Sequence, residues 1–179
     1  MKDKKIVIGV TGSAAAFKAA ILASRLKQDG YSLRTVLTEN AQRFIGVETF
    51  KALTRNPVFC RLFPRDNTFD AVLHIGLARW LDLLAIVPAT ANVIGKIAGG
   101  IADDLLTSLV LAVDKPVLIA PAMNKTMYLN PAVQDNIKLL RQRGYHIIEP
   151  ADGHLACGES GKGRLADPED IIKKIGGLI

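Results

Sequence analysis

The sequence has little cysteine and no long apolar run, and each absence excludes a class of protein. Its 179 residues contain two cysteines, Cys60 and Cys157. Two thiols so far apart are too few for a disulfide framework or a zinc site, and they favour a reducing compartment. No apolar stretch reaches the ~18 residues of a membrane span without a polar interruption. We therefore expect a cytoplasmic protein with no membrane partner and no metal site.

Aromatic residues and clustered charges are also scarce. Phe, Trp and Tyr make up 6% of the residues, and no basic run is interleaved with them, so a surface for single-stranded nucleic acid has little support. The 23 Lys and Arg residues exceed the 17 Asp and Glu residues, for a net charge of +6, but they are scattered along the chain. This balance mildly favours small anionic ligands and only weakly favours nucleic acid, so we expect no nucleic-acid partner.

Short apolar runs alternate with amphipathic segments, and 49% of the residues are apolar, enough for the core of one domain over residues 1–179. Continuous apolar runs are typical of strands buried on both faces. We expect strands at Ile6 to Val10, Leu33 to Leu37, Leu83 to Val87, Val117 to Ala120 and Ile147 to Ile148. We expect helices at Ala14 to Gln28, Gly46 to Leu53, Ala91 to Ala98, Leu105 to Val113, Pro131 to Arg143 and Pro168 to Ile175. The alternation predicts an α/β fold with a mostly parallel, doubly wound sheet.

Polar residues follow four of the expected strands, at the point where each strand ends. They are Thr11-Gly12-Ser13, Thr38-Glu39-Asn40, Thr90-Ala91-Asn92 and Pro121-Ala122-Met123-Asn124. Ligands of open α/β sheets bind outside the carboxyl ends of the strands, where the strand order reverses. We therefore expect all four segments to converge on one crevice.

The turn from Gly9 to Ala16 joins the first expected strand to the first helix and is suited to a phosphate. Backbone N–H groups and the helix dipole would hold the anion, and Ser13 would add a hydroxyl donor. Ala15 stands where a dinucleotide fingerprint has its third glycine, so FMN fits better than NAD. Glu39, at the end of the second strand, keeps a ribose-binding interpretation open. The structural alternative is a glycine turn without a ligand.

His74 and Cys157 are the main candidates for acid–base or nucleophilic chemistry, and His154 is a further histidine candidate. His74 precedes a helix expected at Ile75 to Leu81. Histidine is suited to proton transfer near neutral pH, although a lone histidine is more commonly structural. Cys157 lies on a polar stretch near Lys162 and Arg164, whose charges could lower its pKa.

Several other polar residues have both a structural and a functional interpretation. Asn124 could donate its amide to a substrate carboxylate or cap the helix that follows. Asp103-Asp104 could bind a metal, but without nearby histidines a helix cap is favoured. Cys60 has an apolar context that indicates a core residue, and His146 stands at a strand start, where a structural role is expected.

A polar, glycine-rich stretch from Ala151 to Asp167 follows the last expected strand. It contains His154 and Cys157. Long loops inside compact domains are usually lids, binding loops or disordered segments. We expect a lid over a binding site, and the alternative is an unstructured loop before the C-terminal helix.

Six motifs occur in order, and together they are specific. They are Gly12-Ser13-Ala14-Ala15-Ala16, His74-Ile75, Pro88-Ala89-Thr90-Ala91-Asn92, Gly100-Ile101-Ala102-Asp103-Asp104-Leu105-Leu106, Pro121-Ala122-Met123-Asn124 with Met127, and Ala156-Cys157-Gly158 through Gly163-Arg164. The set resembles the homo-oligomeric flavin-containing cysteine decarboxylase family over essentially the whole chain. Tyr128 departs from the pattern, since peptide-decarboxylating members tend to have tryptophan there.

The resemblance implies a flavodoxin-like (Rossmann-like) three-layer fold, bound FMN, and homotrimers or dodecamers with active sites between subunits. It assigns His74 as the active-site base, Asn124 as the clamp for the substrate carboxylate, and Cys157, on a lid, as the proton donor. The FMN contacts that it implies are Gly12, Ser13, Ala14, Thr38, Thr90, Ala91, Asn92, Val93, Ala122 and Met123.

The activity implied by the resemblance is FMN-dependent decarboxylation of phosphopantothenoylcysteine to phosphopantetheine in coenzyme A biosynthesis. Loss of CO₂ from a cysteine derivative leaves electrons on a carbon without an acceptor, and a flavin can create one. Many bacterial members carry a synthetase half after this domain. We therefore expect either a stand-alone enzyme, with a separate phosphopantothenate–cysteine ligase as a partner, or a shortened chain.

Three other functions compete with this interpretation. The nearest is decarboxylation of a C-terminal cysteine in a peptide. A non-catalytic FMN-binding regulatory subunit belongs to a different class, and the joint presence of His74, Asn124 and Cys157 argues against it. An electron-transfer flavoprotein is disfavoured because it needs no acid, carboxylate clamp or lid.

Overall fold

A six-stranded parallel sheet forms the centre of the computed structural model, which describes residues 4–63, 72–154, 156 and 158–179. The strand order is β3-β2-β1-β4-β5-β6, and every neighbouring pair is parallel. The strands are β1 (Lys5–Val10), β2 (Ser32–Leu37), β3 (Val58–Phe59), β4 (Leu83–Ala89), β5 (Val117–Pro121) and β6 (His146–Ile147). This is the doubly wound, Rossmann-type order, with the reversal between β1 and β4.

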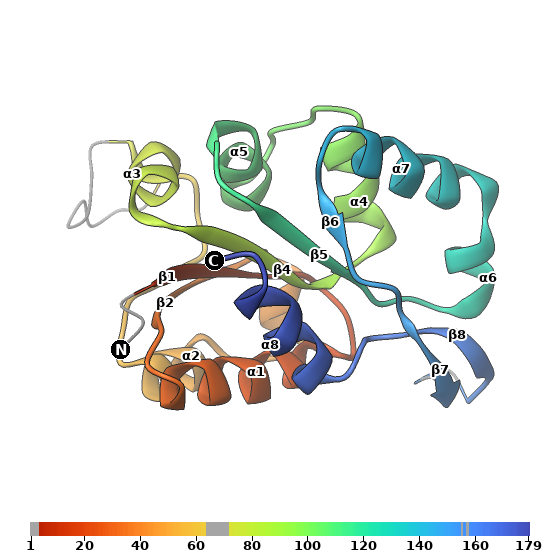
Figure 1. The fold of residues 1–179 in the computed structure, drawn as a ribbon, viewed down its shortest axis with the longest axis horizontal. Coiled ribbons are helices and arrows are strands. Elements are labelled where there is room, and N and C mark those ends of the chain that lie inside the picture. Colours follow the sequence, from red (N-terminus) through yellow and green to blue (C-terminus); the bar gives the residue numbers. More distant parts are fainter. Residues whose placement is uncertain (1–3, 64–71, 155, 157) are drawn as a thin grey trace.

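Helices cover both faces of the sheet and complete three layers (Figure 1). One face carries α1 (Ala16–Gln28), α2 (Val47–Thr54) and α8 (Pro168–Gly176). The other carries α3 (Leu73–Trp80), α4 (Ala91–Ala98), α5 (Leu105–Ala112) and α7 (Pro131–Gln142). The expected three-layer α/β fold is confirmed. No helix in the described part of the chain is long and apolar enough to cross a membrane.

Each face of the sheet has its own apolar core. Leu22 of α1 and Phe50 of α2 are fully buried in the first core. Leu77, Ile94 and Leu109 are fully buried in the second, on the opposite face. All seven residues of β4 are buried, which explains why the central strands are continuous apolar runs rather than alternating ones.

Helix boundaries follow local capping chemistry, and two of them differ from the sequence expectation by more than one residue. Asn130 caps α7, its side chain accepting from the Ala132 N–H at 3.0 Å, and Pro131 occupies the first turn as expected. The first helix begins at Ala16 rather than Ala14, because Ser13 and Ala15 form a turn in which the Ser13 Oγ accepts from the Ala15 N–H. The third helix begins at Leu73, so His74 lies inside α3 rather than before it.

The glycine-rich stretch after the sheet forms a β-hairpin instead of an open loop. Strands β7 (Ala151–His154) and β8 (Ser160–Arg164) pair antiparallel, beside the short helix α6 (Lys125–Leu129), the helix expected to follow Asn124. The Met123 N–H donates to the Gly163 carbonyl at 3.0 Å. A Cβ at Gly163 would lie 2.4 Å from the Met123 carbonyl oxygen, so glycine permits this close approach.

Gly163→Ala should detach the hairpin, because the added methyl group collides with a backbone oxygen and Gly163 also has a positive φ of +144°. Hydrogen exchange of the β7 and β8 amides should lose its protection. Gly144→Ala is the matched control, since Gly144 has φ +87° but a Cβ added there would meet nothing within 4 Å. The control should lower the free energy of unfolding by about 1–2 kcal/mol and leave hairpin protection intact. Equal hairpin protection in the two variants would contradict the proposed close packing.

Candidate functional site

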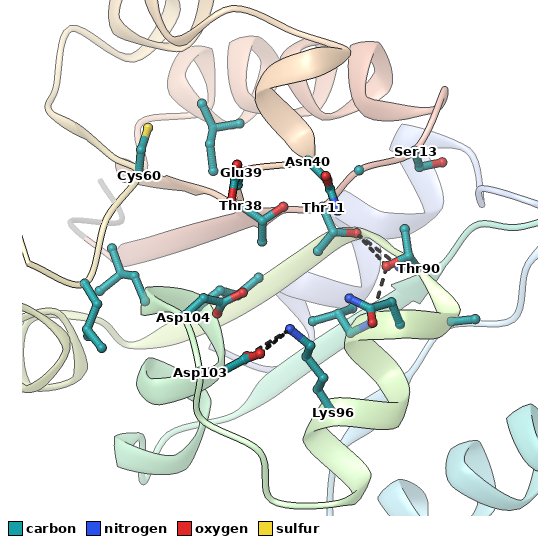
Figure 2. Close-up of a pocket in the computed structure, with 18 of the residues that line it drawn as sticks. Thr11, Ser13, Thr38, Glu39, Asn40, Cys60, Thr90, Lys96, Asp103 and Asp104 are labelled. Atoms are coloured by element: carbon teal, nitrogen blue, oxygen red, sulfur yellow. Dashed lines mark hydrogen bonds and ion pairs between the residues drawn. The ribbon is translucent and has the colours of Figure 1, made fainter.

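A pocket of about 800 Å³ opens at the carboxyl ends of the parallel strands (Figure 2). Its wall is formed by residues that follow β1, β2, β3, β4 and β5, together with the first turns of α4 and α5. The lining residues are Thr11, Gly12, Ser13, Leu37, Thr38, Glu39, Asn40, Cys60, Arg61, Leu62, Phe63, Thr90, Ala91, Asn92, Val93, Lys96, Asp103, Asp104, Leu105, Leu106, Ala122, Met123 and Met127. The volume is within the usual range for small-molecule and cofactor sites.

Thr11 joins the two strands that flank the reversal of strand order. Its side chain is buried, and its hydroxyl donates to the Pro88 carbonyl at 2.8 Å. The same oxygen accepts from the Thr90 N–H at 3.1 Å. Thr90 in turn caps α4 by accepting from the Val93 N–H at 3.3 Å. One hydroxyl therefore fixes the end of β1 against the start of α4, at the floor of the pocket.

The turn after β1 is built of small residues and packs closely against the segment that follows β2. A Cβ at Gly12 would lie 2.6 Å from the Cβ of Asn40. Ser13, Ala14 and Ala15 then lead into α1, a thirteen-residue helix whose first turn has no acidic side chain. This arrangement of small side chains, backbone N–H groups and a helix N-terminus is suited to a phosphate group.

Two aspartates and a lysine line the opposite wall of the pocket, and their roles are structural. Asp104 caps α5 in a capping box, accepting from the Thr107 N–H at 2.8 Å. Lys96 pairs with Asp103 at 2.7 Å, and its hydrogen bond lowers the pKa of the Asp103 carboxyl. Among the described residues no group of three or more His, Cys, Asp or Glu side chains is placed to hold a metal ion. The capping box at the start of α5 confirms the expected helix cap by Asp104.

A second pocket, of about 710 Å³, meets the first at three shared residues, Ser13, Ala122 and Met123. Its remaining wall comes from the start of α1, from Asn124 and from the hairpin. These residues are Ala14, Ala15, Phe17, Lys18, Asn124, His154, Ala156, Gly158, Gly163, Arg164 and Leu165. The two pockets are therefore neighbours in one composite site.

Asn124 uses the two ends of its amide for different purposes. The carbonyl oxygen accepts from the Thr126 N–H at 2.7 Å and so caps α6. The amide nitrogen donates to the Glu159 carboxylate at 2.8 Å. The expected capping role is present, and the cap leaves the donor end of the amide directed at a carboxylate from the hairpin.

A carboxylate at the end of the sheet ties the hairpin to helices α6 and α7. Glu149 accepts from the Tyr128 hydroxyl at 2.7 Å, pairs with Arg141, and lies 3.3 Å from the Lys162 ammonium on β8. Burial, with the hydrogen bond to Glu149 and the charge of that carboxylate, raises the pKa of Tyr128 to about 12. Burial opposes ionisation of Glu149, but the Tyr128 hydrogen bond and the two cations outweigh it and lower the pKa.

The structure brings most of the expected ligand-contacting residues together. Every expected FMN contact lines the first pocket except Ala14, which lines the second. Asn124 and His154 line the second pocket, whereas His74 lines neither of the two as the described residues define them. Cys157 lies outside the described residues.

Two residues of the first pocket were misjudged or missed from the sequence. Cys60 packs at the edge of one core, but it is only half-buried and also lines the first pocket. Burial raises the pKa of the Cys60 thiol. Lys96 was missed, and the available signal was its position four residues after Asn92, on the same face of α4.

Comparison with known proteins places this site in a family. The model of the Flavoprotein family matches residues 1–179. The chain belongs to the flavoprotein family. It is 49% identical to the coenzyme A biosynthesis bifunctional protein CoaBC of Bacillus subtilis, covering 97% of this chain and 42% of that relative. It is 43% identical to a probable phosphopantothenoylcysteine decarboxylase of Streptococcus mutans, covering 96% of this chain and 97% of that relative.

Solved structures of flavoproteins share the fold over nearly the whole chain. A mutant PPC decarboxylase complexed with pantothenoylaminoethenethiol superposes with a TM-score of 0.86 at 33% identity, over 98% of this chain and 97% of the other. The FMN-dependent cysteine decarboxylase SpaF gives a TM-score of 0.83 at 35% identity, over 96% and 94% of the two chains. The expected resemblance is confirmed.

Thr11→Val should destabilise this flavoprotein, because it leaves the Pro88 carbonyl and the Thr90 N–H without their shared partner. The expected loss in the free energy of unfolding is about 1–3 kcal/mol, measured by urea denaturation. Thr11→Ser keeps the hydroxyl and loses only a methyl group, so it is the control and should retain most of the stability. Equal losses in the two variants would mean that the hydroxyl bridge contributes nothing.

Proposed function

We propose that this chain is an FMN-dependent decarboxylase that converts phosphopantothenoylcysteine to phosphopantetheine in coenzyme A biosynthesis. The observation that carries the proposal is the pair of pockets that meet at Ser13, Ala122 and Met123, with the Asn124 amide in the second. The first pocket would hold the cofactor and the second the substrate. The names of the relatives support the reaction, although the chain spans 42% of the length of the first of them.

FMN fits the residues of the first pocket. Gly12 and Ser13 line this pocket, and the N-terminus of α1 faces the same turn. That turn would hold the one phosphate of FMN, with Thr38, Thr90, Ala91, Asn92 and Val93 around the rest of the molecule and Ala122 and Met123 beside the ring. When bound, FMN supplies the electron sink that loss of CO₂ from a cysteine derivative requires.

The protein side chains would hold the carboxylate and move the protons. The net reaction replaces a carboxylate on carbon by a proton and releases CO₂. Asn124 is suited to orient the carboxylate, because a neutral amide donates a hydrogen bond without fixing the negative charge as strongly as a cation would. His74 would accept the substrate thiol proton, and Cys157 would return a proton to carbon.

The charges of the second pocket favour an anionic substrate. Lys18 and Arg164 both line it, and they share one carboxylate, that of Asp167, at 3.5 Å and 3.3 Å. Two cations against one acid leave a net positive charge at this wall, while the Glu159 carboxylate lies at the Asn124 amide. This favours a phosphorylated substrate over an uncharged peptide chain ending in cysteine.

We further infer that the protein forms a homotrimer in which a neighbouring subunit supplies His74. Support comes from the position of His74, which lines neither pocket, and from Phe63 at the rim of the first pocket, whose side chain is 84% exposed. Met127 of the first pocket and Phe17 of the second are exposed as well, and exposed apolar side chains that gather beside a binding site are typical of a surface that another protein covers. The active site would then be complete only in the assembled trimer. We expect the trimer to be a soluble cytoplasmic protein.

The purified protein should absorb as a flavoprotein, release FMN on denaturation, and release CO₂ from phosphopantothenoylcysteine but not from a peptide ending in cysteine. Ser13→Glu should lower FMN affinity at least about tenfold, because its carboxylate would face the phosphate in a site partly shielded from water. Ser13→Gln has nearly the same size without the charge and is the control. Release of NAD or FAD instead of FMN would contradict the cofactor, and CO₂ from the peptide alone would identify the rival activity.

Mixing two inactive variants tests the shared active site. His74→Asn removes the base, and Asn124→Asp keeps the cap of α6 but replaces the amide donor by a charge. If each site combines Asn124 of one subunit with His74 of its neighbour, an equal mixture reassembled into trimers should recover about a quarter of the wild-type activity, since one site in four joins two intact residues. Each variant alone should stay inactive. No recovery in the mixture would place both residues in one subunit.

A further inference from the structure

The contact between Asn124 and Glu159 joins the substrate pocket to the hairpin that covers it. Glu159 directly precedes β8 and is exposed, and its carboxylate accepts from the Asn124 amide nitrogen at 2.8 Å. Asn124 is the residue proposed above to hold the carboxylate of the substrate. The group bonded to it in the structure is itself a carboxylate.

We propose that Glu159 is an internal ligand of Asn124 that takes the place of the substrate carboxylate in the ligand-free protein and is displaced when substrate binds. This inference rests on the proposed function, since it needs Asn124 to receive a substrate carboxylate. Glu159 would thereby determine how strongly the site binds carboxylate ligands relative to ligands without that group.

Electrostatic repulsion explains why the substrate carboxylate and the Glu159 carboxylate would bind the Asn124 amide in turn and not at the same time. A substrate carboxylate within hydrogen-bond distance of the Asn124 nitrogen would lie close to the Glu159 oxygens. Two anions at such a distance repel each other. Lys125 begins the helix beside this contact, and its side chain packs against Gly161 of the hairpin. The repulsion is relieved when Glu159 moves out toward water.

The remaining hairpin contacts allow Glu159 to leave without detaching the hairpin. The Gly163 carbonyl still accepts from the Met123 N–H, and Lys162 still faces Glu149. Both contacts lie on β8, after Glu159 in the chain, so they hold the base of the hairpin while its tip moves. Decarboxylation removes the charge that displaced Glu159, so Glu159 would return to Asn124 as the product leaves.

Glu159→Gln, in the FMN-loaded protein, tests the exchange by calorimetric binding of two ligands. One is phosphopantothenoylserine, which has the carboxylate but lacks the reactive thiol, and the other is phosphopantetheine, which lacks the carboxylate. The variant should bind the first roughly fivefold tighter or more and the second with unchanged affinity, because only the first competes with Glu159. Glu159→Ala should give the same difference or a larger one.

Asp152→Asn is the matched control, since it removes one negative charge from the exposed face of β7 in the same hairpin. It should leave the ratio of the two affinities unchanged. A Glu159→Gln variant that binds the carboxylate ligand more weakly, or that shifts both ligands equally, would overturn the inference while leaving the proposed function intact. A wild-type protein that binds neither ligand would overturn the proposed function, and the inference with it.

Discussion

The hydroxyl of Thr11 is the interaction on which the rest of the site depends. It lies where the strand order reverses, and it holds the carbonyl of Pro88 and the N–H of Thr90 together. Pro88 lies in β4 and Thr90 directly follows it. A single side chain therefore sets the distance between the end of β1 and the end of β4 at the floor of the pocket. The turn at Gly12 and the first turn of α4 face each other across that distance, which fixes the width available to a ligand.

Much of the fold follows from local sequence, because its elements carry their own boundary chemistry. The limits of α4 were predicted without error, since Thr90 caps its first turn and Gly99 follows its last. Polar residues at the strand ends predicted about half of the residues that line the first pocket, because parallel strands place their carboxyl ends at one edge whatever the details of packing.

The hairpin and the position of His74 could not be predicted, for a different reason. Strand β8 is Ser-Gly-Lys-Gly-Arg, and it lacks the apolar alternation that marks a half-buried strand. It is held by close backbone approach at Gly163 and by Lys162 facing Glu149, which join segments distant in sequence. Whether His74 reaches a binding pocket depends on which parts of the protein, or of a neighbouring subunit, pack around α3. The residues next to His74 in the sequence do not contain that information.

The hairpin contacts divide into two kinds with different consequences for turnover. Those at its base, the backbone bond to Gly163 and the ion pair of Lys162, involve groups that no substrate replaces. The contact at its tip pairs Asn124 with a carboxylate, the same group that the proposed substrate brings. If every hairpin contact were of the first kind, the whole hairpin would have to detach before a ligand could bind. The Asn124–Glu159 contact can instead be replaced by a ligand carboxylate while the contacts of Gly163 and Lys162 stay in place. Because the proposed decarboxylation would destroy the competing carboxylate, the same exchange would favour the return of Glu159 to Asn124 once CO₂ has left.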